Sequence, residues 1–447
     1  MATKHSFGFH ITVATAIILG AAARTEGAST MAVPAETFLD SIGTQSAISR
    51  RGEDFQKTLK CVQYLGVRWM RSGIEGDVPI EQLIELHKET GLRFSWGLGS
   101  GGADLPKLIE TAKRLASVGA LLAFEGPNEP NNWGVTYQGH FGGRDKSWAA
   151  VAEMQRDLYN AVKNDPILRN YPVWSPSEVG AETDNVGLQF LTIPPGAQTL
   201  LPAGTRYADF VNVHNYIYHP NAPGLEENKT WKAADPTRAC KVDGLFGEFG
   251  VTWARHFQGY SDTALLTLPR VTTETGTTIG GAVTEEIHAL NLLTLYLDQF
   301  KRGWAYTANY LMRDRVDEAG NQRFGFFAPD YSPRKAAVYL HNLTTILEDR
   351  DSFKPGKSDY SIGSPPATVH DLLLQKSNGA FELVVWDERI DGTLDKVEAT
   401  LGRSFATVNV YDPTRGTPAI QTLTDVSSVS VTLSDHPVII EMTTSSR

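Results

Sequence analysis

The stretch LLAFEGPNEPNNW, residues 121–133, decides the fold of this chain. Apolar residues run from Leu121 to Phe124, and a proline-rich turn follows, with Asn128 and Glu129 at its centre. A short apolar run that ends in a turn is typical of a buried strand in a parallel sheet. When such strands form a barrel, functional side chains lie in the loops at their carboxyl ends. We therefore expect a buried strand over 121–125 and a functional loop directly after it.

The same pattern repeats along most of the chain. Between about Phe38 and Asp349, short apolar runs alternate with amphipathic helical stretches, as in βα units around a parallel sheet. The predicted strands cover 39–42, 67–71, 93–97, 121–125, 172–176, 210–215, 270–274 and 304–310, and the clearest helices cover 53–65, 148–162, 284–300 and 333–347. Eight strands are the number that closes a (β/α)8 barrel. The predicted fold class is α/β, with a TIM barrel over residues 31–349.

The last part of the chain follows a different period. After about Arg350, apolar and polar residues alternate in steps of two, and Asn378-Gly379 lies between two such runs. An Asn-Gly pair between alternating runs is a strong signal for a β-hairpin. We predict a C-terminal antiparallel β-sandwich domain over 350–447, and strands before Phe38 are candidates to complete it.

The charge and the first residues indicate where the protein acts and on what. The formal net charge is −10, which gives no basic surface for nucleic acid and favours a neutral ligand. Lys4, an apolar stretch over 7–19 and Ala21-Ala22-Ala23 predict a signal peptide over 1–23. We expect a secreted or periplasmic protein with no membrane segment once the signal is removed, and a retained N-terminal anchor is the alternative.

Two cysteines and two sequons leave questions open. Cys61 and Cys240 are too few for a metal spacing, and both a single bridge and two buried free thiols are consistent with them. Asn228 and Asn342 each stand in a glycosylation sequon, which matters only in a eukaryotic source.

The residues at the predicted strand ends carry a resemblance to clan A retaining glycoside hydrolases. It rests on GPNEP with Asn128 and Glu129, on TTETG with Glu274, on His214-x-Tyr216 and on Arg71. The trailing β-module is similar to those of families 30, 39, 51 and 79, and the barrel also resembles family 5, without assignment to one of them. The resemblance implies no cofactor and no metal ion.

The resemblance also implies a role for each residue. Glu129 would be the general acid/base, and Glu274 the nucleophile. Asn128 would hold the sugar 2-hydroxyl, and Arg71 would hydrogen-bond the nucleophile and keep its pKa low. His214 and Tyr216 would lie beside the pair, with the tyrosine hydroxyl on Glu274.

Two carboxylates are what the chemistry of a retaining glycosidase needs. One attacks the anomeric carbon, while the other protonates the departing oxygen and later deprotonates water, at a separation of roughly 5 to 5.5 Å. The expected function is a secreted retaining glycosidase that cleaves O-glycosidic bonds of an oligo- or polysaccharide. Four aromatic residues near strand ends are candidates to stack on sugar rings, and packing within the barrel is the alternative for each: Trp96, Trp133, Trp253 and Tyr310.

Other readings remain open at this point. Glu248 in GEFG is a rival nucleophile, although the strand count favours Glu274. A catalytically inactive carbohydrate-binding barrel is the alternative from another class. A metal-dependent hydrolase would need clusters of His and Asp, of which only His214 qualifies. A Schiff-base enzyme would need a lysine at a strand end, which none of the predicted strands has.

Overall fold

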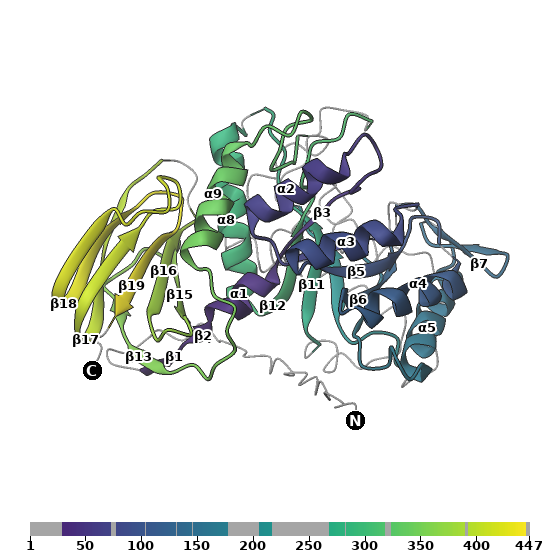
Figure 1. Cartoon of the computed structure of the whole chain (residues 1–447), viewed down its shortest axis with the longest axis horizontal. Helices are drawn as coiled ribbons and strands as arrows, with labels where there is room; N and C mark the ends of the chain where they lie inside the picture. The colour runs from purple at the N-terminus through teal and green to yellow at the C-terminus, as the bar shows by residue number, and fades with distance from the viewer. Residues whose placement is uncertain are drawn as a thin grey trace, which may run out of the picture.

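A computed structural model of the chain describes residues 29–72, 77–102, 104–130, 132–144, 146–177, 205–216, 268–281, 283–317, 323–388 and 392–443. Its centre is an eight-stranded parallel sheet (Figure 1). The strands, in sheet order, are β10 (Val211–His214), β11 (Arg270–Thr275), β12 (Trp304–Asn309), β3 (Ile42–Gln45), β4 (Trp69–Ser72), β5 (Arg93–Leu98), β6 (Leu121–Pro127) and β9 (Val173–Trp174). A parallel bridge between Trp174 and Phe210 joins the two ends of this order. The predicted TIM barrel is confirmed.

Helices surround this barrel on its outside (Figure 1). They are α1 (Ala35–Ser41), α2 (Phe55–Leu65), α3 (Ile80–Thr90), α4 (Leu105–Ser117), α5 (Ala149–Asn164), α8 (Glu285–Lys301) and α9 (Lys335–Ile346). Three of them begin at a side-chain cap, because the carboxylates of Asp54 and Asp104 and the hydroxyl of Thr284 each accept from a backbone N–H of the first turn. Within the described residues, no helix has the length and apolar character needed to cross a bilayer.

The first predicted strand, over 39–42, is wrong because most of it lies in a helix. Residues 39–41 end helix α1, and the strand begins at Ile42. Helix α1 buries Ala35, Phe38 and Leu39, the i, i+3, i+4 spacing of one helix face, and the Phe38 ring packs edge-on to Phe300 of α8 at 5.2 Å. In a helix of seven residues, this face reads in the sequence as a short apolar run, which is why it resembled a strand.

The barrel interior has an apolar layer below a polar one. The rings of Trp69, Trp174 and Tyr306 meet with centroids 5.6 to 5.8 Å apart. Gly43 of β3 makes room for them, since a Cβ there would lie 2.2 Å from the Trp69 ring. Side chains two positions apart on a strand point to the same side. Trp69, Ala123 and Val271 belong to the apolar layer. The residues two positions further along the same three strands are polar: Arg71, Glu125 and Thr273.

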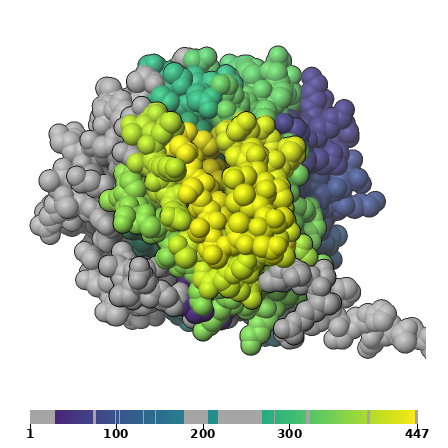
Figure 2. Space-filling model, turned by 90° about the vertical axis from the view of Figure 1, so that its left-hand side faces the viewer, coloured from purple at the N-terminus to yellow at the C-terminus, as the bar shows by residue number. Residues whose placement is uncertain are grey.

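The C-terminal module is a mostly antiparallel β-structure at one end of the molecule (Figure 1), and its surface faces the viewer in yellow in Figure 2. Its strands are β13 (Lys357–Asp359), β14 (Ser361–Ile362), β15 (Val369–Gln375), β16 (Phe381–Asp387), β17 (Asp395–Tyr411), β18 (Gln421–Leu433) and β19 (Val438–Thr443). The main sheet has the order β14-β17-β19-β16-β15-β2, with β18 on β17. β1 (Ser29–Met31) pairs with β13, and β2 (Val33–Pro34) adds to β15, so strands before Phe38 complete the module as expected.

The module packs on helices α8 and α9 of the barrel. Trp386 of β16 is fully buried among residues of the barrel core, and its indole N–H donates to Asp298 of α8 at 2.7 Å. Asn342 of α9 is buried and donates its amide to the Pro413 carbonyl at 2.7 Å. This burial excludes Asn342 as a glycan acceptor in the folded protein.

Several predicted features fall on residues outside the described ranges. These are the signal peptide over 1–23, the sequon at Asn228, the rival nucleophile Glu248, Trp253 and Cys240. Cys61 is buried in α2, and the question of its bridge to Cys240 stays a prediction.

Candidate active site

Glu129 lies in the loop that follows β6, at the carboxyl end of the barrel. It is buried and has a positive φ of 42°, a left-handed conformation that is uncommon outside glycine and concentrates at functional sites. Its Oε2 accepts from Asn132 Nδ2 at 3.2 Å and from the indole N–H of Trp133 at 3.1 Å. Its Oε1 lies 2.7 Å from His214 Nδ1. The carboxyl group is therefore fixed on both oxygens.

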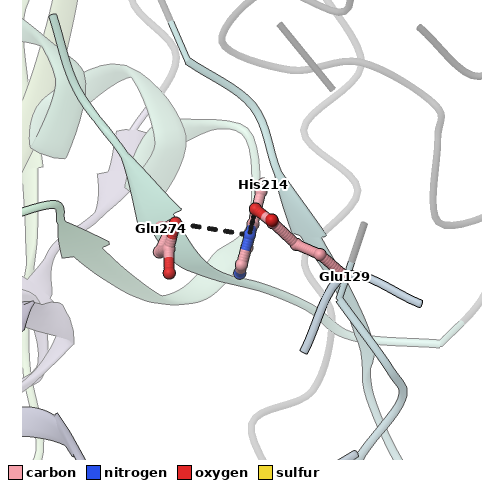
Figure 3. Close-up of side chains that lie close together, drawn as sticks. All are labelled: Glu129, His214 and Glu274. Atoms are coloured by element: carbon pink, nitrogen blue, oxygen red, sulfur yellow. Dashed lines mark hydrogen bonds and ion pairs between the residues drawn. The ribbon is translucent and has the colours of Figure 1, made fainter. Parts of the chain in front are cut away.

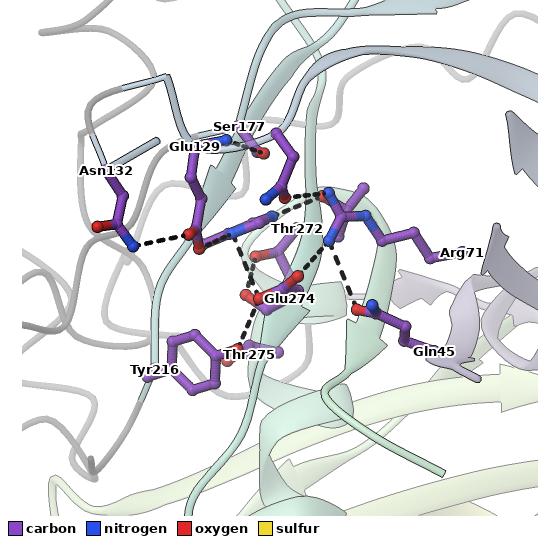
Figure 4. A network of polar contacts seen from close by, with 12 residues as sticks. Gln45, Arg71, Glu129, Asn132, Ser177, Tyr216, Thr272, Glu274 and Thr275 are labelled. Carbon is purple, nitrogen blue, oxygen red and sulfur yellow. Dashed lines mark hydrogen bonds and ion pairs between the residues drawn. The ribbon is translucent and has the colours of Figure 1, made fainter. Parts of the chain in front are cut away.

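Glu274 comes from β11, on another side of the barrel. Arg71 Nη1 donates to its Oε1, and the Tyr216 hydroxyl donates to its Oε2 at 2.7 Å (Figure 4). Its Oε2 also lies 3.5 Å from His214 Nδ1, so the histidine stands between the two carboxyl groups (Figure 3). One oxygen of Glu129, one oxygen of Glu274 and one nitrogen of His214 all lie within 4.8 Å of one another.

Arg71 of β4 links the site to the barrel interior. Its side chain is fully buried, and its Nη2 donates to Asn128 Oδ1 at 2.8 Å. Its Nε lies 2.9 and 3.0 Å from the two oxygens of Glu125. The sequence analysis missed Glu125 as a site residue. Its signal was a charged residue inside the apolar strand, at the position where the side chain points into the barrel.

The pKa values of Glu129 and Glu274 depend on their burial and on the different groups that contact each carboxyl group. Burial raises the pKa of Glu129, against the hydrogen bonds from Asn132 and Trp133 and the charge of Arg71. Burial also raises the pKa of Glu274, against His214, Arg71 and the Tyr216 hydroxyl. The expectation that Arg71 keeps this pKa low is therefore only partly met, because desolvation is the larger effect.

His214 and Tyr216 are held neutral beside the carboxyl groups. Burial lowers the pKa of His214 to about 4, and it raises the pKa of Tyr216 well above its usual value. The Tyr216 ring packs edge-on against Phe324 at 5.4 Å and against Tyr310 at 6.3 Å. At neutral pH the imidazole is thus uncharged and the phenol keeps the proton that it donates to Glu274.

The aromatic residues predicted to stack on sugars differ in their exposure and in their contacts. Trp133 is 55% exposed and stands directly beside Glu129. Tyr310 is buried at 8% exposure and supports Tyr216. Trp96 donates its indole N–H to the Leu108 carbonyl of α4 at 3.1 Å, which favours the packing alternative for this residue.

The cluster of Glu129, His214 and Glu274 also has the size of a metal site. However, Arg71 and Tyr216 already donate to the two oxygens of Glu274. A divalent cation in that position would stand close to a buried guanidinium and would be repelled by it. The donor set therefore fits acid/base chemistry better than metal binding.

Comparisons with solved structures show which known proteins share this fold. The chain is similar to a family 39 glycoside hydrolase from the gut symbiont Bacteroides cellulosilyticus WH2, with a TM-score of 0.56, 15% identity and coverage of 91% of this chain and 81% of the other. It is similar to CelM2, a bifunctional glucanase-xylanase from a metagenome library, with a TM-score of 0.60, 12% identity and coverage of 93% and 97%. The fold is that of (β/α)8 glycoside hydrolases with a β-rich C-terminal part.

A third structure of the same class is the alpha-L-arabinofuranosidase from Thermotoga maritima, with a TM-score of 0.52, 11% identity and coverage of 93% and 100%. No family model matches the sequence, and no curated protein matches it. The likeness therefore lies in the fold and leaves the activity to be argued from the site.

Proposed function

We propose that this protein is a retaining glycosidase, with Glu129 as general acid/base and Glu274 as nucleophile. The observation that carries the proposal is the close approach of the two carboxyl groups, with oxygens within 4.8 Å. Retaining enzymes hold their carboxyl groups about 5 to 5.5 Å apart, whereas inverting enzymes need about 6.5 to 9.5 Å to admit a water molecule. The close approach of one oxygen of Glu129 to one oxygen of Glu274 supports the shorter, retaining arrangement.

The two roles follow from the partners of each carboxyl group. Glu274 contacts the permanent charge of Arg71 and a hydroxyl donor, both of which favour a carboxylate. Glu129 contacts a neutral histidine and two neutral donors. When one proton is shared by two buried acids, it goes to the acid with the weaker stabilisation of its charge. Glu129 is therefore the protonated general acid, and Glu274 is the ionised nucleophile.

The reaction then has two steps. An oxygen of Glu274 attacks the anomeric carbon and forms a glycosyl ester, while Glu129 gives its proton to the departing oxygen. Water then enters, Glu129 removes a proton from it, and the resulting oxygen displaces Glu274. Two displacements on the same carbon retain its configuration.

Trp133 marks the side of the leaving group. Its indole N–H is bonded to the oxygen of Glu129 that faces away from His214, and more than half of its surface is exposed. Because Glu129 protonates the departing oxygen, the exposed ring lies where the leaving sugar would stack through its apolar face. An oligo- or polysaccharide fits this arrangement.

The test begins with a panel of 4-nitrophenyl glucosides, xylosides and arabinofuranosides and the matching polysaccharides. The structural neighbours are described as acting on such sugars, which makes them the first choices. Proton NMR of the first product follows its anomer. A retained anomer and a loss of at least about 10²-fold in Glu129→Ala and Glu274→Ala are expected. The exposed Glu110→Ala on α4 is the matched control and keeps full activity.

The choice of nucleophile has its own test. A 2-fluoro sugar with a good leaving group traps the glycosyl-enzyme, and peptide mass spectrometry locates the label. We expect the label on Glu274. A label on Glu248, or an inverted first product, would overturn the assignment. Activity in excess chelator is expected to stay unchanged, and its loss would favour a metal enzyme.

Export of the protein is a separate proposal that rests on the sequence of residues 1–23 alone. Expression of the full chain in a secreting host, with N-terminal sequencing of the exported product, tests it. Cleavage close to Ala23 is expected, and full-length protein retained in the cytoplasm would contradict it.

A further inference from the structure

We propose that Thr273 is a positioning residue that fixes the tautomer of His214 and so keeps a proton on Glu129. Thr273 lies in β11, one position before Glu274, and its buried hydroxyl contacts Glu125 and His214. The inference rests on the proposed function, because it assigns a role to that proton in glycoside cleavage.

The Thr273 hydroxyl has three polar neighbours and one hydrogen. Its Oγ1 lies 2.9 Å from Glu125 Oε1, 3.1 Å from Asn212 Oδ1 and 3.0 Å from His214 Nε2. The oxygens of Glu125 and Asn212 are acceptors, so the hydroxyl hydrogen is directed to one of them. The hydrogen between Thr273 and His214 must then belong to the histidine. His214 Nε2 is therefore the donor.

Arg71 enforces this direction from the other end. It donates through Nε to both oxygens of Glu125, at 2.9 and 3.0 Å, and through Nη2 to Oε1. A carboxylate that accepts several bonds from a guanidinium serves Thr273 only as an acceptor. The chain of bonds thus runs from His214 to Thr273 and on to Glu125, away from the catalytic carboxyl groups.

The opposite nitrogen of His214 then determines the state of Glu129. His214 is fully buried, and its pKa of about 4 leaves a neutral ring with a single hydrogen at pH 7. With that hydrogen on Nε2, Nδ1 carries a lone pair. Glu129 Oε1 lies 2.7 Å from Nδ1, a hydrogen-bond distance that needs a hydrogen between the two atoms. The only source is the carboxyl group of Glu129, which is therefore protonated.

The same tautomer suits both halves of the reaction. Before cleavage it holds the proton on Glu129, ready for the leaving group. After cleavage the lone pair on Nδ1 faces the new carboxylate, disfavours its charge and so makes it a stronger base toward water. The charged or titratable groups around this position are Arg71, Glu125 and Glu274, with Tyr216 bonded to Glu274. Arg71 is hydrogen-bonded to both Glu125 and Glu274, and Tyr216 is hydrogen-bonded to Glu274.

Removing the hydroxyl tests the role of Thr273. In Thr273→Val, which keeps the shape, Nε2 loses its acceptor, and the tautomer with hydrogen on Nδ1 can donate to an ionised Glu129. We expect the alkaline limb of the kcat/KM profile to move down by roughly one pH unit, a tenfold change in proton affinity. Glycosides with poor leaving groups lose about tenfold in kcat at pH 7, whereas dinitrophenyl glycosides, which need no protonation, stay within about twofold. Thr273→Ser restores the hydroxyl and the wild-type profile.

The tautomer of His214 can also be measured directly in the wild-type protein, without a substrate and without Thr273→Val. Nitrogen NMR of protein labelled with 15N-histidine distinguishes the two tautomers, and Thr273→Ser and His214→Asn assign the signal among eleven histidines. We expect a hydrogen on Nε2 and a bare Nδ1 in the wild type. A hydrogen on Nδ1 would overturn the inference even if the protein is a glycosidase. The expected tautomer in a protein without glycosidase activity would instead refute the proposed function and leave the hydrogen-bond assignment standing.

Discussion

Removal of the Tyr216 hydroxyl is the change that most directly tests the electrostatic design of the site. Tyr216→Phe deletes one hydrogen bond of 2.7 Å to the carboxylate of Glu274 and leaves the packing on Phe324 and Tyr310 in place. A hydrogen bond to a charged group contributes about 1.5 to 3 kcal/mol. Since about 1.36 kcal/mol corresponds to one pKa unit, the pKa of Glu274 should rise by about 1 to 2.

The sign of the effect on activity follows from the required ionisation. Glu274 attacks as a carboxylate, so a higher pKa moves the acidic limb of the kcat/KM profile to higher pH by about 1 to 2 units. The same free energy corresponds to a loss of about 10- to 150-fold in kcat/KM on the acidic side. The assay is a pH series of initial rates on the best aryl glycoside from the panel.

A matched control separates this effect from a general loss of a buried hydroxyl. Tyr296→Phe removes another buried hydroxyl, which donates to the Gly43 carbonyl at 2.8 Å. It should lower stability by about 1 kcal/mol and leave both limbs in place. An acidic limb that does not move in Tyr216→Phe, with kcat/KM within twofold of wild type, would refute the role given to this tyrosine.

Three further changes test other parts of the molecule. Trp133→Phe removes a donor from Glu129 and should raise its pKa, which moves the alkaline limb upward by about 1 pH unit. Gly43→Ala places a Cβ against the Trp69 ring and should lower the free energy of unfolding by about 1 to 3 kcal/mol, measured by thermal or urea unfolding. Burial raises the pKa of Asp298 to about 7, so the folded protein holds a proton there that the unfolded chain releases above about pH 4. Stability should therefore fall by up to about 4 kcal/mol as the pH rises from about 4 to 7, and Asp298→Asn should remove that loss.

Each of these predictions has an outcome that contradicts it. An alkaline limb that moves downward in Trp133→Phe would show that the indole N–H does not stabilise the carboxylate. For the glycine, Gly363→Ala is the control, because its Cβ would meet nothing closer than 3.6 Å and the change should be nearly neutral. Equal unfolding temperatures for Gly43→Ala and Gly363→Ala would show that the Trp69 ring does not exclude a side chain at position 43. Parallel stability curves for wild type and Asp298→Asn between pH 4 and 7 would show that the proton is not held in the folded state.

Much of the fold could be read from the sequence because a barrel strand has a simple signature. Seven of the eight barrel strands lie where short apolar runs predicted them, since each is buried on both sides. The run over 39–42 failed because the short helix α1 buries a face of the same composition. Period alone does not separate a strand from a helix of two turns.

The candidate site was predictable only in part, for a physical reason. Glu129 and Glu274 stand at strand ends, where the barrel geometry places functional groups. Glu125 and Thr273 lie one layer deeper and act through partners that are distant in the chain: Arg71 precedes Glu125 by 54 positions, and His214 precedes Thr273 by 59. The direction of those hydrogen bonds depends on the complete set of neighbours, which only the three-dimensional arrangement supplies.

The pairing of β2 with β15 has a consequence for how the protein is made. Residues 33–34 are synthesised some 340 residues before their partners Leu374-Gln375. The sheet that these strands share therefore cannot be completed until the barrel between them has been synthesised. A fragment that starts at Arg350 would expose the free edge of β15, a template for aggregation. Transplanting this module to another enzyme requires residues 29–34 as well, grafted to the opposite end of the host.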